Sequence, residues 1–326
     1  MNEIAVIGAG AWGVALAIQA ERAGNRVTLW ARRGAAAIEA AREAPRLPGQ
    51  LLPERIRVTE AMPTRADLVL LVVPTQHMRG VLAALPDAPV AICAKGVEAG
   101  SLLLPLEILA DARPTLAGAV LTGPNFAREV ASGLPAAAVV AGADPALREH
   151  VASLMGTPSF RLYGNDDPVG AQLGGAAKNV IAIAAGAVTG AGLGENARAA
   201  LITRGLAELG RLTVAMGGRQ ETVMGLSGRG DLLLTCTGPS SRNFSLGLAL
   251  GQGRSLADIM SERSTATEGV ATAPALLARA RRHDPDLDLP ICSAVAALLE
   301  GRLSLAQAIH SLLARPRRDE HESRPA

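Results

Sequence analysis

The chain opens with a glycine-rich turn between an apolar segment and a helical pattern. These three parts are Ile4–Ile7, the motif GAGAWG at 8–13 and Val14–Ala23. In this strand–turn–helix order, Gly8 permits a tight turn, Gly10 lets the backbone approach a pyrophosphate, and Gly13 lets helix and strand pack closely. Free N–H groups at the helix N-terminus favour an anion. We therefore predict a dinucleotide site; a glycine-rich turn in another α/β fold is the alternative.

The residues after the second predicted strand, Arg26–Trp30, bear on the choice of cofactor. A protein that prefers NAD(H) usually has Asp or Glu at this place to bind the ribose 2′-hydroxyl. Here Arg32 and Arg33 offer guanidinium groups, which suit a 2′-phosphate. We expect NADP(H) to be preferred, with NAD(H) as a second usable cofactor. A solvated arginine pair on a turn is the alternative.

Further strand patterns fill the N-terminal half. They are Ile56–Thr59, Asp67–Val73, Val90–Ala94, Val120–Thr122, Ala136–Ala141 and Ser159–Tyr163. Near-continuous apolar runs are typical of parallel strands that are covered on both faces. The pattern predicts an α/β fold with a doubly wound, Rossmann-type parallel sheet over residues 1–170. Ligands bind beyond the carboxyl ends of such strands, where Lys95 and the turn GPN at 123–125 lie.

Helical patterns replace strand patterns after Pro168. They are Val169–Gly190, Asn196–Gly217, Leu246–Leu250, Ser255–Met260, Glu268–Arg282, Ile291–Leu299 and Ser304–Ala314. We predict an all-helical substrate and catalytic domain over residues 171–314. The charged, proline-containing residues 315–326 are predicted to be a disordered tail.

Lysine is almost absent from this chain. Of 32 basic residues only Lys95 and Lys178 are lysines, and both lie among small apolar residues. Arginine cannot release a proton in a protein, whereas lysine can when its pKa is lowered. We predict that both lysines are functional, with Lys178 near the start of a helix. Depletion of lysine codons in a GC-rich genome is the alternative.

A second glycine-rich stretch interrupts the helical half. GLSGRGD at 225–231 predicts a loop that ends in Asp231, and a polar cluster, Ser241, Arg242 and Asn243, follows. The cluster offers hydrogen-bond donors for a phosphate, and Asp231 could hold Lys178. A connecting loop with a capping aspartate is the alternative.

The composition argues against several classes of protein, such as nucleic-acid binders and membrane-spanning proteins. The 326 residues suffice for two domains, and a net charge of +2 without a clustered basic face argues against a nucleic-acid partner. Cys93, Cys236 and Cys292 are scattered, so we expect reduced thiols, no metal site and a cytoplasmic location. The sequence predicts neither a signal peptide nor a membrane span.

Taken together, the motifs resemble the bacterial NAD(P)-dependent glycerol-3-phosphate dehydrogenases over nearly the whole chain. The resemblance rests on GAGAWGVALA at 8–17, AKG at 94–96, GPNFAREV at 123–130, AAKNVIAIAAG at 176–186, GLGENARAALITRGLAE at 192–208, GLSGRGDLLLTC at 225–236, SRN at 241–243 and EGV at 268–270. It implies reversible reduction of dihydroxyacetone phosphate, a phosphorylated triose, to sn-glycerol 3-phosphate for glycerophospholipid synthesis. We expect a homodimer because many such enzymes are symmetric dimers, although the sequence shows no interface signature.

The resemblance also implies residue roles. Lys178 matches the proton-transfer lysine, Lys95 contacts substrate and cofactor, and Asp231 joins them as a catalytic residue. Substrate contacts match Lys95, Gly123, Asn125, Lys178, Asn179, Asp231, Thr235, Ser241, Arg242 and Asn243. Cofactor contacts match Gly8, Gly10, Ala11, Trp12, Gly13, Arg32, Arg33, Ala127, Arg242, Glu268 and, more weakly, Ala266.

Three positions depart from the family pattern. Asn125 stands where Ser is usual, Arg229 where Leu is more frequent, and Ala266 where a larger apolar residue is common. Two other classes stay open: a related dehydrogenase of phosphogluconate or a β-hydroxy acid, and a cofactor-sensing or scaffold protein. The SRN cluster argues against the first, and the intact Lys178, Lys95 and Asp231 argue against the second.

Overall fold

The computed structural model describes residues 1–263 and 267–316. Within them, eight strands form one sheet in the order β3-β2-β1-β4-β5-β6-β7-β8. The strands are β1 (Glu3–Ile7), β2 (Arg26–Trp30), β3 (Ile56–Thr59), β4 (Leu68–Leu71), β5 (Val90–Ile92), β6 (Gly118–Thr122), β7 (Ala136–Ala141) and β8 (Phe160–Asn165). Each predicted strand is confirmed, with ends that differ by at most two residues.

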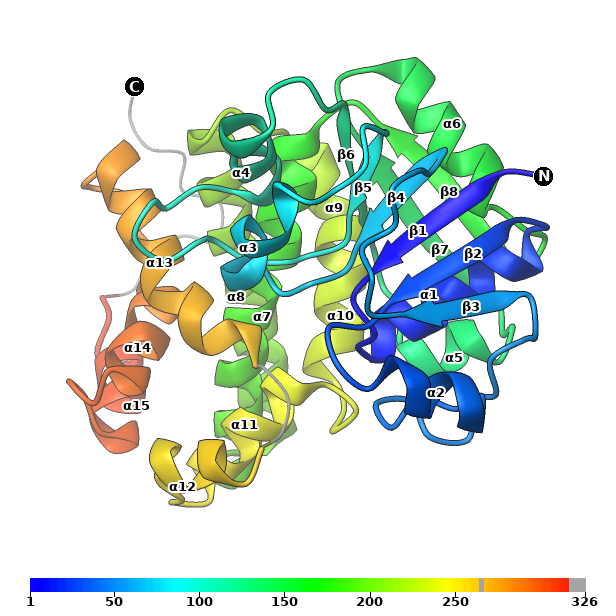
Figure 1. The fold of residues 1–326 in the computed structure, drawn as a ribbon. Helices are drawn as coiled ribbons and strands as arrows, with labels where there is room; N and C mark the ends of the chain where they lie inside the picture. The colour runs from blue at the N-terminus through cyan, green and yellow to red at the C-terminus, as the bar shows by residue number, and fades with distance from the viewer. Residues whose placement is uncertain (264–266, 317–326) are drawn as a thin grey trace.

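Helices cover both faces of the sheet (Figure 1). These are α1 (Ala11–Arg22), α2 (Ala35–Ala41), the 3₁₀ turn η1 (Thr75–His77), α3 (Arg79–Leu82), α4 (Pro105–Ala112), α5 (Ala127–Ala131) and α6 (Pro145–Met155). Side chains alternate along β1, so Ile4 and Val6 pack with α1, α5 and α6, whereas Ala5 and Ile7 pack with α3 and α4. Burial of both faces explains why these strands are almost entirely apolar.

The sheet is not wholly parallel as predicted. Strands β1 to β6 pair in parallel, but β6 and β7 pair antiparallel, with Val120 opposite Ala141. Strand β8 is parallel to β7, so the last two strands run against the other six. Periodicity shows which residues are buried but not the direction in which a strand enters the sheet.

The C-terminal part of the described chain is helical, as predicted. Its elements are α7 (Pro168–Gly190), α8 (Gly194–Ala215), α9 (Gln220–Met224), the π-helical turn η2 (Leu226–Gly230), α10 (Asp231–Cys236), α11 (Arg242–Gly251), α12 (Leu256–Ser261), α13 (Glu268–His283), α14 (Pro290–Leu299) and α15 (Leu305–Leu313). Helix α7 lies at the centre, in contact with α8, α10, α11, α13 and α14 (Figure 1). Most of the predicted tail, residues 317–326, lies outside the described residues.

Two local expectations were wrong for the same physical reason. GLSGRGD is not a loop, because η2 leads directly into α10. Lys178 does not lie near a helix start but in the middle of α7, whose bounds match the predicted helical range Val169–Gly190. The glycines that suggested these breaks permit close packing instead. A Cβ on Gly174 would lie 2.5 Å from the Ser227 carbonyl oxygen, and one on Gly228 would lie 2.1 Å from that of Val223.

Within the described residues, α7 is also the one helix long and apolar enough to cross a membrane by length and composition. The sequence alone gave no such expectation. In the structure, 89% of its most apolar window is buried inside the protein, where the surrounding helices cover it.

Candidate active site

The two lysines and Asp231 meet where the helical part faces the carboxyl ends of the strands. Lys95 follows β5 and donates a hydrogen bond from Nζ to Asp231 Oδ2 at 2.6 Å. Lys178, on α7, donates to the other carboxylate oxygen, Oδ1, and to Thr235 Oγ1 at 3.0 Å. The Thr235 hydroxyl donates in turn to the Asp231 carbonyl oxygen at 2.6 Å. One carboxylate therefore holds two ammonium groups side by side.

Burial gives these charges unusual proton affinities. Asp231 is 1% exposed and Lys178 is 7% exposed. Burial lowers the pKa of Lys178 to about 8; Asp231 opposes this shift and Lys95 adds to it. Burial by itself would raise the pKa of the Asp231 carboxyl, but the two ammonium groups outweigh it and hold that pKa below its usual value. Lys178 is therefore poised to exchange a proton near neutral pH.

The turn after β6 closes one side of this cluster. Lys95 Nζ also donates to the Gly123 carbonyl oxygen at 3.3 Å. Gly123 has φ +143°, and a Cβ there would lie 3.0 Å from the Ala138 Cα, so glycine is needed. Asn125 donates from Nδ2 to the Ala137 carbonyl oxygen at 3.0 Å, and its buried Oδ1 has no hydrogen-bond partner within the part of the chain that the structure describes. The Asn125 amide therefore anchors the turn to β7.

The glycine motif has the geometry that a dinucleotide requires. Gly8 has φ +121°, and a Cβ on Gly13 would lie 1.8 Å from the Gly8 carbonyl oxygen, so both positions demand glycine. A Cβ on Gly10 would meet nothing within 4 Å, which leaves open space at the N-terminus of α1, where Ala11 and Trp12 begin the helix. The motif therefore fits a pyrophosphate at the helix terminus.

Two cationic side chains, Arg32 and Arg33, follow the carboxyl end of β2. Arg32 and Arg33 are both exposed, and neither has a hydrogen-bond or ion-pair partner in the described part of the chain. Ala127, a predicted cofactor contact, begins α5 after the turn at Gly123. Ala266, the weaker predicted cofactor contact, lies outside the described residues.

Comparison with known proteins agrees with this geometry. A family model described as the NAD-dependent glycerol-3-phosphate dehydrogenase N-terminus matches residues 3–148, and the model of the C-terminus matches residues 167–310. The chain belongs to this dehydrogenase family. A glycerol-3-phosphate dehydrogenase [NAD(P)+] of Acidiphilium cryptum is 55% identical over 98% of this chain and 98% of the relative. That of Gluconobacter oxydans is 54% identical over 96% of this chain and 97% of the relative.

A solved structure gives the same result for the fold. The crystal structure of glycerol-3-phosphate dehydrogenase from Coxiella burnetii is 37% identical, covers 96% of this chain and 99% of that chain, and superposes with a TM-score of 0.91. The resemblance drawn from the motifs and the predicted two-part fold are thus confirmed. The roles of individual site residues remain predictions.

The SRN cluster of this dehydrogenase family member lies at the start of helix α11. Ser241 is its N-cap, and its hydroxyl accepts a hydrogen bond from the Phe244 N–H at 3.2 Å. Asn243 donates to Asn179 Oδ1 at 2.9 Å and accepts from the Gly269 N–H at 3.1 Å, so it joins α7, α11 and α13. The two asparagines therefore brace the wall of the site. Arg242 is the exposed member of the cluster.

Glu268 connects the helical part to the sheet. It begins α13, and its carboxylate accepts a hydrogen bond from the backbone N–H of Thr75, which follows β4. Burial raises its carboxyl pKa, while Arg242, Thr75, Lys95 and Lys178 oppose that shift. The predicted cofactor contact therefore lies beside both lysines and near Arg242.

Sequence reasoning missed two hydroxyls near this cluster. Thr75 and Thr122 are 2% and 3% exposed, and neither Oγ1 has a hydrogen-bond partner among the described residues. A Cβ on Gly175 would lie 3.2 Å from Lys95 Cγ and 3.5 Å from Thr122 Oγ1, so α7 packs closely against both side chains at this glycine. The positions of the two threonines at the ends of β4 and β6 could have indicated them, because ligands bind at these strand ends.

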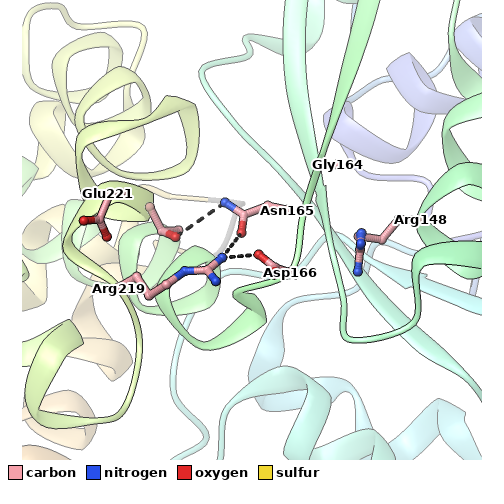
Figure 2. A pocket seen from close by; sticks show the side chains of 7 residues that line it. Arg148, Gly164, Asn165, Asp166, Arg219 and Glu221 are labelled. Carbon is pink, nitrogen blue, oxygen red and sulfur yellow. Dashed lines mark hydrogen bonds and ion pairs between the residues drawn. The ribbon is translucent and has the colours of Figure 1, made fainter.

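A separate cavity lies away from this cluster (Figure 2). It measures about 560 Å³ and is lined by Arg148, Gly164, Asn165, Asp166, Arg219, Glu221 and Thr222. Arg219 pairs with Asp166 and donates to Asn165 Oδ1 at 3.4 Å, so much of its polar lining is internally paired. None of the predicted site residues that the structure describes lines this cavity. The described residues also contain no group of three or more His, Cys, Asp or Glu that could hold a metal ion.

Proposed function

We propose that this protein catalyses the reversible NAD(P)H-dependent reduction of dihydroxyacetone phosphate to sn-glycerol 3-phosphate. The observation that carries the proposal is the buried Lys178, held by Asp231 and Thr235 beside Lys95, with a pKa lowered to about 8. Membership of the glycerol-3-phosphate dehydrogenase family and the names of the 54–55% identical relatives support this substrate.

Lys178 acts as the proton donor and acceptor of the reaction. In the reducing direction its ammonium group donates a hydrogen bond to the C2 carbonyl oxygen and then protonates the developing alkoxide. Asp231 orients Lys178 through Oδ1 and Lys95 through Oδ2. Lys95, which is partly exposed, supplies positive charge where negative charge develops.

The remaining side chains hold the phosphorylated substrate. Arg242 is exposed at the start of α11 and offers charge-assisted hydrogen bonds to a phosphate. Ser241, whose hydroxyl oxygen accepts from Phe244, keeps its own proton to donate. Asn179 and Asn243 set the distance between α7 and α11, and Gly123 and Asn125 shape the opposite wall.

The cofactor site fits NADP(H) in preference to NAD(H). The open space at Gly10 fits the pyrophosphate. The guanidinium groups of Arg32 and Arg33, which have no ion-pair partner among the described residues, suit a 2′-phosphate. A bound nicotinamide cofactor would supply the hydride. Arg242 and Glu268 would line the nicotinamide side, close to Lys95.

We further propose that the enzyme is cytoplasmic, supplies sn-glycerol 3-phosphate to glycerophospholipid synthesis and acts as a homodimer. These proposals rest on family membership alone.

The test is the initial rate of NADPH oxidation with dihydroxyacetone phosphate, run beside NADH. Rapid oxidation that requires the phosphorylated substrate supports the proposal, and a higher kcat/KM with NADPH supports the cofactor preference. If folded protein that binds NADPH turns over neither cofactor, the proposed reaction is wrong. Phosphogluconate and β-hydroxy acids would then be assayed with NADP+.

A further inference from the structure

Residues 96–104, here called the strap, connect Lys95 to α4 and cross from the sheet to the helical part. Val97 and Leu104 are 0% and 1% exposed and belong to the hydrophobic core of the helical part, against which Leu102 also packs. The strap therefore leaves the domain that carries Lys95 and returns to it after packing on the other domain.

The sheet side of the strap is held by the segment after β4. Gln76 donates from Nε2 to the Val97 carbonyl oxygen at 2.8 Å, and its Oε1 accepts from the Ala99 N–H at 2.9 Å. Arg79 donates from Nε to both carboxylate oxygens of Glu98 at 2.9 Å. These bonds fix the strap to its own domain.

The far side of the strap is held by Arg279 on α13. Its guanidinium donates to the Leu102 carbonyl oxygen at 2.7 Å and to both carboxylate oxygens of Glu107 at 2.7 Å each. Glu107 Oε2 also accepts from the Leu104 N–H at 2.7 Å, which caps the start of α4. Leu102 has φ +64°, a conformation that non-glycine residues rarely adopt unless other contacts impose it.

We propose that the Arg279–Glu107 ion pair positions Lys95 by clamping the strap between α13 and α4. This inference rests on the proposed function. Helix α13 packs on α7, which carries Lys178, and its first residue, Glu268, lies near both lysines. Arg279 lies eleven residues after Glu268, about 16 Å along the helix. The clamp thus fixes the Lys95 side of the site against the Lys178 side without touching either lysine.

Loss of the clamp is expected to change the pKa of Lys178. The groups that face Lys178 are Asp231, Lys95, Glu268 and the Cys236 thiol. If the strap loosens and Lys95 moves away, Lys178 loses a neighbouring positive charge, and its titration midpoint rises. If instead α13 shifts and Glu268 moves away, the midpoint falls. The direction therefore distinguishes movement of the strap from movement of the helix.

The two lysines make this measurable by NMR. Protein that contains [ε-13C]lysine has two side-chain signals, and the Lys95→Arg variant assigns them. In the intact protein the Lys178 signal is expected to titrate near pH 8. In Arg279→Gln we expect the midpoint to rise by about half a unit or more. We also expect kcat/KM for dihydroxyacetone phosphate to fall about 10- to 100-fold, since small misplacements are costly in catalysis.

Arg113→Gln is the matched control. Arg113 has the same 20% side-chain exposure as Arg279 and likewise donates to backbone carbonyl oxygens and to a carboxylate, Asp87. These contacts lie within the sheet domain and do not involve the strap. We expect Arg113→Gln to leave the Lys178 midpoint and kcat/KM near those of the intact protein, whatever its effect on stability.

Three outcomes separate the inference from the proposed function. An unchanged or lower Lys178 midpoint in Arg279→Gln overturns the clamp. If that variant does not fold, Glu107→Gln is titrated instead, because its amide oxygen can still accept from the Leu104 N–H, and the same shift is required. An intact protein that is inactive on dihydroxyacetone phosphate overturns the proposed function, whereas the titration still decides whether Arg279 positions Lys95.

Discussion

Asp231 is a single carboxylate between two ammonium groups, and this imbalance sets the protonation of the site. Two lysines and one aspartate leave an excess positive charge in a buried place. That charge is least costly when Lys178, the more buried lysine, can give up its proton. A lysine at position 178 can therefore release a proton, which an arginine could not.

Lys178→Arg tests this at the residue itself. The guanidinium keeps the positive charge but cannot release a proton, so we expect kcat to fall by a factor of about 100 to 10,000. NADPH affinity, measured by fluorescence titration, should stay within a few-fold of normal. Turnover close to that of the unmodified protein would remove Lys178 from the mechanism.

The pH dependence should differ between the two directions of the reaction. Reduction needs the ammonium form of Lys178, so kcat/KM for dihydroxyacetone phosphate should fall as pH rises above about 8. Oxidation needs the neutral amine, so kcat/KM for sn-glycerol 3-phosphate should fall as pH drops below about 8. Profiles in both directions check this, and parallel profiles would contradict it.

At the scale of elements, glycine lets α7 and α11 cross closely. A Cβ on Gly247 would lie 1.9 Å from the Ile183 carbonyl oxygen, and one on Gly186 would lie 2.0 Å from that of Phe244. Both contacts are with backbone, so neither can be relieved by turning a side chain. The crossing also brings Asn243 within hydrogen-bond reach of Asn179.

Gly247→Ala should therefore destabilise the protein. We expect a loss of more than about 2 kcal/mol in the free energy of unfolding, because the two helices must move apart. Gly80→Ala is the control: position 80 is in helix α3, and a Cβ there would meet nothing within 4 Å. That change should stabilise by about 0.5–1 kcal/mol. Urea denaturation of both variants is the measurement, and equal stabilities would refute the argument.

The turn between β2 and α2 should control the choice of cofactor. Arg32→Asp replaces a cation that suits a 2′-phosphate with an anion that repels it. We expect the ratio of kcat/KM with NADPH to that with NADH to fall at least about tenfold. Arg65→Asp is the control, because Arg65 is exposed and precedes β4, at the amino ends of the parallel strands, whereas Arg32 follows the carboxyl end of β2. An unchanged ratio in Arg32→Asp would exclude the 2′-phosphate role.

At the scale of the molecule, a buried carboxylate connects the helices of the C-terminal part. Glu208 on α8 is 1% exposed and accepts hydrogen bonds from the N–H groups of Ile291 at 2.6 Å and Cys292 at 3.1 Å, at the start of α14. Burial raises its pKa to about 7, although these two N–H groups oppose the shift. The packing of α14 is therefore sensitive to pH.

The sign of this effect follows from proton binding. The pKa of Glu208 is about 7 in the folded protein, whereas that of an unperturbed glutamate is about 4.3. Between about pH 4.3 and pH 7, Glu208 is therefore protonated in the folded state but ionised in the unfolded state. Its contribution to stability is complete below about pH 4.3 and is lost as pH rises through about 7. Glu208→Gln does not titrate, so its stability relative to the unmodified protein should rise by up to about 3 kcal/mol between pH 5 and pH 8.

Denaturation of both proteins at the two pH values checks this prediction, with Glu149→Gln, an exposed position, as the control. A stability difference between Glu208→Gln and the unmodified protein that stays constant with pH would contradict it.

The local structure of the N-terminal half could be predicted from the sequence. The order strand, GAGAWG, helix predicted the dinucleotide turn, because positive φ at Gly8 and the short distance at Gly13 can be met only by glycine. Apolar runs predicted every strand of the sheet, because a strand that is buried on both faces consists almost entirely of apolar residues. The scarcity of lysine singled out Lys95 and Lys178, which the structure brings to one carboxylate.

Tertiary structure decided what local pattern leaves open. Glycines at 174, 225, 228 and 230 suggested a helix start and a loop, but glycine serves equally to break a helix and to let two helices touch. Asp231 meets Lys178 across 53 residues and Lys95 across 136 residues of sequence. Sequence spacing fixes which face a side chain occupies, but only the packing of α7, α10 and the strap on the strand ends brings these faces together.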